Sequence, residues 1–166
     1  LEAGRAAHAG AHLVSAPHWR AQVQAAAQRL SEHGRGFVRE TPLWKLPAHA
    51  LGISQAGGEV WLKLEHLQAS GSFKARGMMN RLLSNAIPPS GVIVASGGNA
   101  GIATGGAAQA LGVHCEVFLP EVSSEAKRAR LRALGAQVVV VGAGYADALA
   151  ACLARQRGCG ALVTHA

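Results

Sequence analysis

The sequence predicts an α/β fold, a three-layer architecture in which helices cover both faces of an open parallel sheet. Continuous apolar runs rich in Val, such as residues 138–141, are typical of strands that are covered on both faces. Stretches with helical character separate these runs, as right-handed βαβ units require. Only 4% of the residues are aromatic and 21 are Gly, and small side chains let helices pack closely on a sheet.

The expected elements follow in order along the chain. Residues 1–14 predict a flexible tail, and Ser15 with Pro17 predicts the start of a helix that continues to about Glu32. Apolar residues recur in this helix at i, i+3, i+4 and i+7 and predict one buried face: Val23, Ala26, Ala27 and Leu30. A polar connection runs from Thr41-Pro42-Leu43 through Gly57-Gly58. Strands are then expected near 59–65, 91–96, 114–119, 137–141 and 161–165, and helices over 73–86, 99–111, 124–134 and 145–156.

Length, composition and charge limit the possible functions. The 166 residues suffice for one domain, or for one domain and part of another. A net charge of +7 could indicate nucleic-acid binding, but the basic residues are scattered and no aromatic residues alternate with them. The densest basic cluster covers several sides of one helix and is expected to be a solvated face: Lys127, Arg128, Arg130 and Arg132. No apolar stretch approaches the length of a membrane span, so neither nucleic acid nor a membrane is an expected partner.

The cysteines and histidines predict no metal centre. The three cysteines have no metal-ligand spacing, and Cys115 and Cys152 fall in an apolar strand and a helix, where we expect buried, inert thiols. His8 and His12 have helical spacing but no third ligand nearby. Reduced thiols are consistent with the cytoplasm.

The first of two glycine-rich turns carries a candidate reactive amine. Lys74 lies in the run Ser70-Gly71-Ser72-Phe73-Lys74-Ala75-Arg76-Gly77, between a predicted strand and a predicted helix. The positive end of the helix dipole disfavours an ammonium there, and a free lysine amine can form a Schiff base with a carbonyl such as that of pyridoxal phosphate. Each residue also has an ordinary structural alternative. Lys74 could be an exposed helix lysine, and Phe73 could pack in the core instead of against a flat ring. Arg76 could form a surface ion pair instead of binding a carboxylate.

The second turn, Ser96-Gly97-Gly98-Asn99-Ala100-Gly101, has the composition of an anion site. Its glycines let the backbone approach a ligand, and free amides at a helix start suit a carboxylate or phosphate. Asn99 can hydrogen-bond a phenolic oxygen, or it can simply cap the helix. Because ligands bind at the carboxyl ends of parallel strands, both turns are expected at one edge of the sheet. A third run, residues 142–147, resembles a dinucleotide fingerprint but has Asp147 in place of its third glycine, so no nicotinamide cofactor is expected.

These motifs together resemble those of a known family. The string Lys63-Leu-Glu65-His-Leu-Gln68-Ala-Ser70-Gly71-Ser72-Phe73-Lys74-Ala-Arg76-Gly77 resembles the signature of pyridoxal-phosphate enzymes of fold type II. Within that group it is most similar to serine/threonine dehydratases. Thr41-Pro42-Leu43, the 96–101 turn, and the runs 134–139 and 144–147 match in order and spacing.

The resemblance implies a cofactor, a reaction and a set of roles. The cofactor would be pyridoxal phosphate, with Lys74 as Schiff-base lysine and catalytic base, Phe73 packed on the pyridine ring and Asn99 bonded to the 3′-oxygen. The substrate carboxylate would be held by one loop: Ser96, Gly97, Gly98, Asn99 and Ala100. The implied reaction is β-elimination of L-serine or L-threonine to a 2-oxo acid and ammonia. The full-length enzyme would be a homo-oligomer, either a dimer or a tetramer.

Some features depart from the family pattern. Gly97 lacks the hydroxyl that serine racemases of this group carry, which disfavours racemisation, and Ala100 replaces the histidine of many threonine dehydratases. The family's glycine-rich phosphate loop and the group facing the pyridine nitrogen do not occur in this sequence. We therefore expect residues 15–58 to belong to a large cofactor domain and residues 59–166 to form a small α/β domain that runs into the rest of the large one. Such a fragment is expected to be inactive alone.

Three interpretations of the function remain open at this point. Elimination by an ammonia-lyase is the first. A threonine synthase or a β-replacement enzyme similar to cysteine synthase is the second. A non-catalytic truncated homologue, serving as an interaction domain, is the third.

Overall fold

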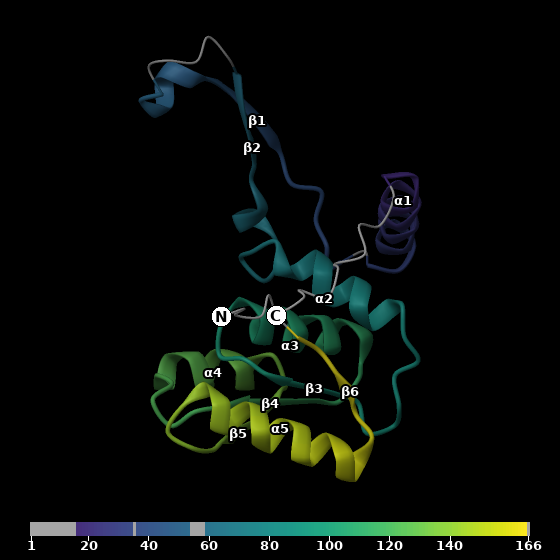
Figure 1. Ribbon diagram of the computed structural model, residues 1–166, viewed down its shortest axis with the longest axis vertical. Helices are drawn as coiled ribbons and strands as arrows, with labels where there is room; N and C mark the ends of the chain where they lie inside the picture. The colour runs from purple at the N-terminus through teal and green to yellow at the C-terminus, as the bar shows by residue number, and fades with distance from the viewer. Residues whose placement is uncertain (1–15, 35, 54–58, 166) are drawn as a thin grey trace, which may run out of the picture.

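The structure, a computed structural model, describes residues 16–34, 36–53 and 59–165 (Figure 1). The helices are α1 (Ala16–His33), α2 (Lys74–Leu83), α3 (Asn99–Leu111), α4 (Glu125–Ala133) and α5 (Tyr145–Cys159), with short 3-10 helices η1 (Ala48–Leu51) and η2 (Glu65–Leu67). The strands are β1 (Leu43–Pro47), β2 (Glu59–Lys63), β3 (Val92–Ala95), β4 (Cys115–Leu119), β5 (Gln137–Val140) and β6 (Leu162–Val163).

A four-stranded parallel sheet in the order β5-β4-β3-β6 forms the centre of the molecule. Its two faces have separate cores. Leu82 of α2, Ile102 of α3 and Leu131 of α4 pack on one side, and Ala148 and Cys152 of α5 pack on the other. Figure 1 shows α3 and α5 on opposite sides of the sheet. The predicted three-layer α/β class is confirmed.

The two central strands explain why the sequence signal was clear. Every residue of β3 and of β4 is buried, so β3 is a continuous apolar run instead of an alternating one, and β4 is apolar except at Glu116. The thiol of Cys115 in β4 is buried, and burial raises its pKa to about 12. Cys152 is buried as well, and burial is the main cause that raises its pKa to about 11. Both thiols are therefore protonated and inert near neutral pH, as predicted.

Glu116 is the one carboxylate within the buried strand β4, and an arginine compensates it. Arg155 of α5 donates from Nε and Nη2 to the Glu116 carboxylate at 2.9–3.3 Å, and His114 Nε2 lies 3.5 Å away. The hydrogen bonds from Arg155 hold the pKa of Glu116 below its usual value of 4.5, against the effect of burial. The pair ties α5 to the sheet.

Replacing Arg155 by methionine is expected to lower the melting temperature at neutral pH, because a buried carboxylate loses its main partner. A lowered native pKa stabilises the fold above the ordinary carboxyl pKa, and this contribution is lost as pH falls through the native pKa. The difference in melting temperature between wild type and variant should therefore shrink below about pH 4. Thermal unfolding at a series of pH values measures this difference. Arg157→Met on the same helix is the control, since Arg157 has no ion pair among the described residues.

The first strand of the expected series does not join the parallel sheet. β2 instead pairs antiparallel with β1, with Trp44 opposite Leu62 and Lys45 opposite Trp61. The expected polar connection over residues 41–58 was therefore wrong at β1. The hairpin extends away from the sheet (Figure 1), and its side chains are largely exposed. A short strand that is not buried on either face shows no continuous apolar run, which is why the sequence did not reveal it.

The first helix forms where predicted but does not bury the predicted face. Val23 is 60% exposed, whereas residues of the last turns of α1 contact the rest of the molecule. Leu30 packs on the main core, and Arg29 donates a hydrogen bond to Asn80 of α2 at 2.5 Å. The tail predicted for residues 1–14 lies outside the described residues. In the part that the structure describes, no helix is long and apolar enough to cross a membrane.

Candidate active site

Lys74 is the first residue of α2, and a tight turn precedes it. Gly71 adopts a φ of +79°, which favours glycine, and its amide donates to the Gln68 carbonyl at 2.8 Å. Arg130 of α4 donates a hydrogen bond from Nη2 to the Ser70 carbonyl of the same turn at 3.4 Å. Ser72 Oγ is buried and has no hydrogen-bond partner in the part of the chain that the structure describes.

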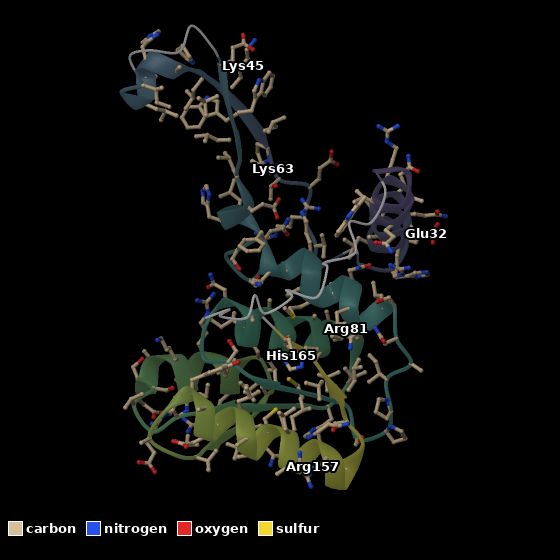
Figure 2. The ribbon with its side chains drawn as sticks, viewed as in Figure 1. Glu32, Lys45, Lys63, Arg81, Arg157 and His165 are labelled. Carbon is tan, nitrogen blue, oxygen red and sulfur yellow. The ribbon has the colours of Figure 1, made fainter. Side chains whose placement is uncertain are left out.

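A cavity of about 820 Å³ opens beside this turn. Its lining consists of Lys63, Glu65, Phe73, Lys74, Arg76, Gly77, Met78, Arg81 and His165. These come from β2, η2, α2 and the residues after β6, and Figure 2 labels Lys63, Arg81 and His165 among them. Four Lys or Arg side chains and one His face a single carboxylate, Glu65. Such a lining suits an anionic ligand.

The Lys74 amine has an aromatic neighbour instead of an acidic one. Its Nζ lies 5.2 Å from the centre of the Phe73 ring. Among the described residues it takes part in no hydrogen bond or ion pair. The side chain of Phe73 is 60% exposed, so this ring is not a core residue. A half-buried amine and an exposed flat ring thus lie together at the cavity.

The second turn begins α3. Gly101 packs so closely on the end of β3 that a Cβ there would lie 1.8 Å from the Ser96 carbonyl oxygen. The amide of Gly98 donates to Ser96 Oγ at 3.3 Å. Gly98 occupies the N-cap position and Asn99 is the first helical residue, with an exposed side chain. The alternative of Asn99 as helix cap was therefore wrong.

Packing between helices brings the two turns together. Met78, one turn after Lys74, forms a buried cluster with Ala100 and Ala103 of α3. The expectation that both turns follow strands of one parallel sheet was wrong for Lys74, because β2 lies in the hairpin. The loop of Ser96, Gly97, Gly98, Asn99 and Ala100 does not contribute to the lining of the cavity. The structure therefore places Lys74 and Phe73 in the cavity and Asn99 at the neighbouring helix start.

Several cavity residues were not singled out from the sequence. Met78 and Arg81 follow Lys74 at i+4 and i+7, a spacing that places all three on one face of a helix. His165 comes from the far end of the chain, where Thr164 is held against α3 by a hydrogen bond of 3.1 Å between the buried hydroxyls of Thr164 and Thr104. Helical spacing could have indicated the first two, but no local signal indicates His165.

The remaining sequence candidates have structural roles or none. Asp147 accepts a hydrogen bond from the Gly144 amide at 3.0 Å at the start of α5, so its side chain satisfies a backbone donor there. Within the described ranges no three His, Cys, Asp or Glu side chains group as metal ligands. His8 and His12 lie outside those ranges.

The sequence matches the model of a known protein family. The family described as pyridoxal-phosphate dependent enzyme matches residues 34–166. The chain belongs to this family. The predicted family and its cofactor, pyridoxal phosphate, are thereby confirmed, and the match includes both glycine-rich turns.

Two curated relatives in this pyridoxal-phosphate family are named for reactions of L-threonine. An L-threonine ammonia-lyase of Thermotoga maritima is 39% identical over 111 residues, which cover 66% of this chain and 28% of that protein. A catabolic L-threonine dehydratase of Staphylococcus aureus is 36% identical over 111 residues, covering 66% and 32%. A solved threonine deaminase from T.th. superposes with a TM-score of 0.72 at 34% identity, covering 87% of this chain and 44% of that one. The chain thus spans about a third of the length of its curated relatives.

The residues present fit the cofactor of the family on three observations. The cavity volume of about 820 Å³ lies in the range of small-molecule sites. The Phe73 ring offers an exposed flat surface next to an amine without a polar partner in the described structure. The buried Ser72 Oγ in the same turn lacks a partner among the described residues, and such an atom costs free energy until one is supplied.

Proposed function

We propose that the complete protein is a pyridoxal-phosphate-dependent ammonia-lyase that deaminates L-serine or L-threonine to a 2-oxo acid and ammonia. The observation that carries this proposal is the Lys74 amine, which lies in a cationic cavity beside the exposed Phe73 ring and has no acidic partner in the described structure. The names of the relatives, an L-threonine ammonia-lyase and an L-threonine dehydratase, support the reaction class.

We assign roles to the residues of the two turns. Lys74 would hold the cofactor through its amine, Phe73 would pack on the cofactor ring, and Asn99 would donate to the 3′-oxygen. Backbone amides of residues 96–100 at the start of α3 would bind the substrate carboxylate, since amides at a helix start favour anions. Residues Ser96, Gly97, Gly98 and Ala100 bring no charged side chain, so the backbone would supply this contact.

The proposed chemistry is an elimination. Pyridoxal phosphate, when bound, supplies an electron sink that makes the α-proton of an amino acid removable. Lys74 Nζ would take that proton, and the β-hydroxyl would leave as water. The elimination releases one water, and the hydrolysis that releases ammonia consumes one water. The net reaction therefore converts serine or threonine to a 2-oxo acid and ammonia.

The setting of the reaction is part of the same proposal. We propose a homo-oligomer in the cytoplasm, with residues 15–58 in a large cofactor domain and residues 59–166 opening a small one. Neither nucleic acid nor a membrane is proposed as a partner.

Product analysis of the complete gene product, loaded with pyridoxal phosphate, tests the reaction. Serine or threonine alone should yield ammonia and a 2-oxo acid in equal amounts. A requirement for O-phosphohomoserine would instead assign a threonine synthase. A requirement for O-acetylserine with a sulfur nucleophile would assign a β-replacement enzyme, and the absence of cofactor binding would assign a non-catalytic homologue.

A further inference from the structure

We propose that Glu65 and Arg76 are positioning residues for Lys74. Their ion pair would fix the first turn of α2, so that the Lys74 amine is held at the cavity beside Phe73. The importance of that amine rests on the proposed function, whereas the contacts that hold it are independent of any reaction.

The ion pair joins two elements with a defined geometry. Arg76 Nε lies 2.9 and 3.1 Å from the two oxygens of Glu65, and Arg76 Nη2 lies 3.1 Å from Oε1. The side chains are 34% and 17% exposed, respectively. Because two nitrogens of a planar guanidinium engage one carboxylate, the pair fixes direction as well as distance. Arg76 belongs to the same first turn of α2 as Lys74.

The carboxylate that receives Arg76 is itself held in place. Thr41 Oγ1 donates to Glu65 Oε1 at 2.5 Å, and Gln68 Nε2 lies 3.3 Å from Oε2. Thr41 and Gln68 are both buried. Burial acts to raise the pKa of Glu65, but the hydrogen bonds it accepts and the charge of Arg76 outweigh burial and lower the pKa. Glu65 is therefore an ionised, immobilised acceptor at neutral pH.

A second set of bonds anchors the same arginine to the chain before the hairpin. Arg76 Nη2 donates to the Arg39 carbonyl at 2.9 Å. Gln68 pairs with the backbone of Arg39 in both directions, at 2.8 and 2.9 Å, and the Lys63 amine donates to the Thr41 carbonyl. The network thus ties the base of the hairpin to the start of α2.

Lys74 depends on this network because it has no comparable anchor of its own. Phe73 occupies the N-cap position of α2, and no side-chain hydrogen bond caps the helix there. The amine contacts the Phe73 ring and, within the described part of the chain, no hydrogen-bond acceptor. A rotation of the first turn would therefore displace the amine directly.

The described part of the chain provides a matched control in the ion pair between Glu116 and Arg155. Glu116 and Arg155 also form a two-nitrogen contact at 2.9–3.3 Å, and Glu116 is only 6% exposed. This pair joins β4 to α5 and contributes nothing to the lining of the cavity. Substitutions in either ion pair should lower the stability of the fold. Only substitutions in the Glu65–Arg76 pair should change the reactivity of the Lys74 amine.

The decisive measurement is the labelling rate of Lys74 in the cofactor-free complete gene product. An amine-reactive reagent is added, and mass spectrometry compares modification at Lys74 with that at the exposed Lys127. In Glu65→Gln we expect the relative rate to change at least about threefold, and in Glu116→Gln to stay at the wild-type value. Arg76→Lys keeps the charge but not the two-nitrogen contact and should also change the rate, which provides a second variant if Glu65→Gln does not fold.

Activity of the loaded protein gives the second readout. Glu65→Gln should lower kcat about tenfold or more with little change in KM, because misplacement of a reacting group by about 1 Å can cost a hundredfold. Unchanged labelling and kcat in both Glu65→Gln and Arg76→Lys would overturn the proposal, and so would an equal change in Glu116→Gln. If the wild type proves inactive, the proposed function fails and the labelling still decides the positioning role.

Discussion

Replacing Lys74 by alanine is expected to lower the proposed deaminase activity of the complete gene product by about a thousandfold or more. A positioned general base alone contributes about 10²–10⁴-fold, and Lys74 would also hold the cofactor. The visible absorption band of the bound cofactor should be lost or displaced in the same variant. Steady-state kinetics and an absorption spectrum of the complete gene product measure both effects.

The control for this prediction is Lys127→Ala. Lys127 lies on α4 and is exposed, so its loss should leave both activity and spectrum unchanged. Reduction with borohydride followed by peptide mapping adds a direct assignment, since the cofactor should be recovered on the peptide that contains Lys74. An unaltered absorption band in Lys74→Ala would refute the role of this amine.

Replacing Gly101 by alanine is expected to destabilise the fold by about 3 kcal/mol, as severe overpacking does. The added Cβ would lie 1.8 Å from the Ser96 carbonyl oxygen, and a backbone atom cannot rotate away as a flexible side chain can. The start of α3 would have to move off the end of β3, which also disturbs the proposed carboxylate loop at residues 96–100. Urea unfolding of the cofactor-free protein measures the change.

Gly158→Ala is the matched control for this substitution. Gly158 lies in α5, and a Cβ there would meet nothing within 4 Å. Alanine has the higher helix propensity, so this variant should be neutral or more stable by up to about 1 kcal/mol. Equal stabilities of Gly101→Ala and Gly158→Ala would contradict the close approach of α3 to β3.

Local signals in the sequence predicted most helices and strands of the parallel α/β unit. β3 and β4 are covered on both faces, so the apolar residues of β3, and those of β4 on either side of Glu116, are visible without knowledge of their partners. The turn at Lys74 was recognisable because its glycine and hydroxyl residues are close in the chain. The family match over residues 34–166 agrees with that part of the prediction.

The sequence by itself therefore determined the parallel α/β class, the two glycine-rich turns and the candidate amine, because each depends on neighbouring residues. Only the tertiary structure decided that β2 pairs with β1, that Val23 stays exposed, and that Met78 joins the two turns. It also decided the partner of Arg76, for which the sequence left both a bound carboxylate and an ion pair open. Such features depend on contacts between segments far apart in the chain, and no local period or composition records which distant segment supplies the partner.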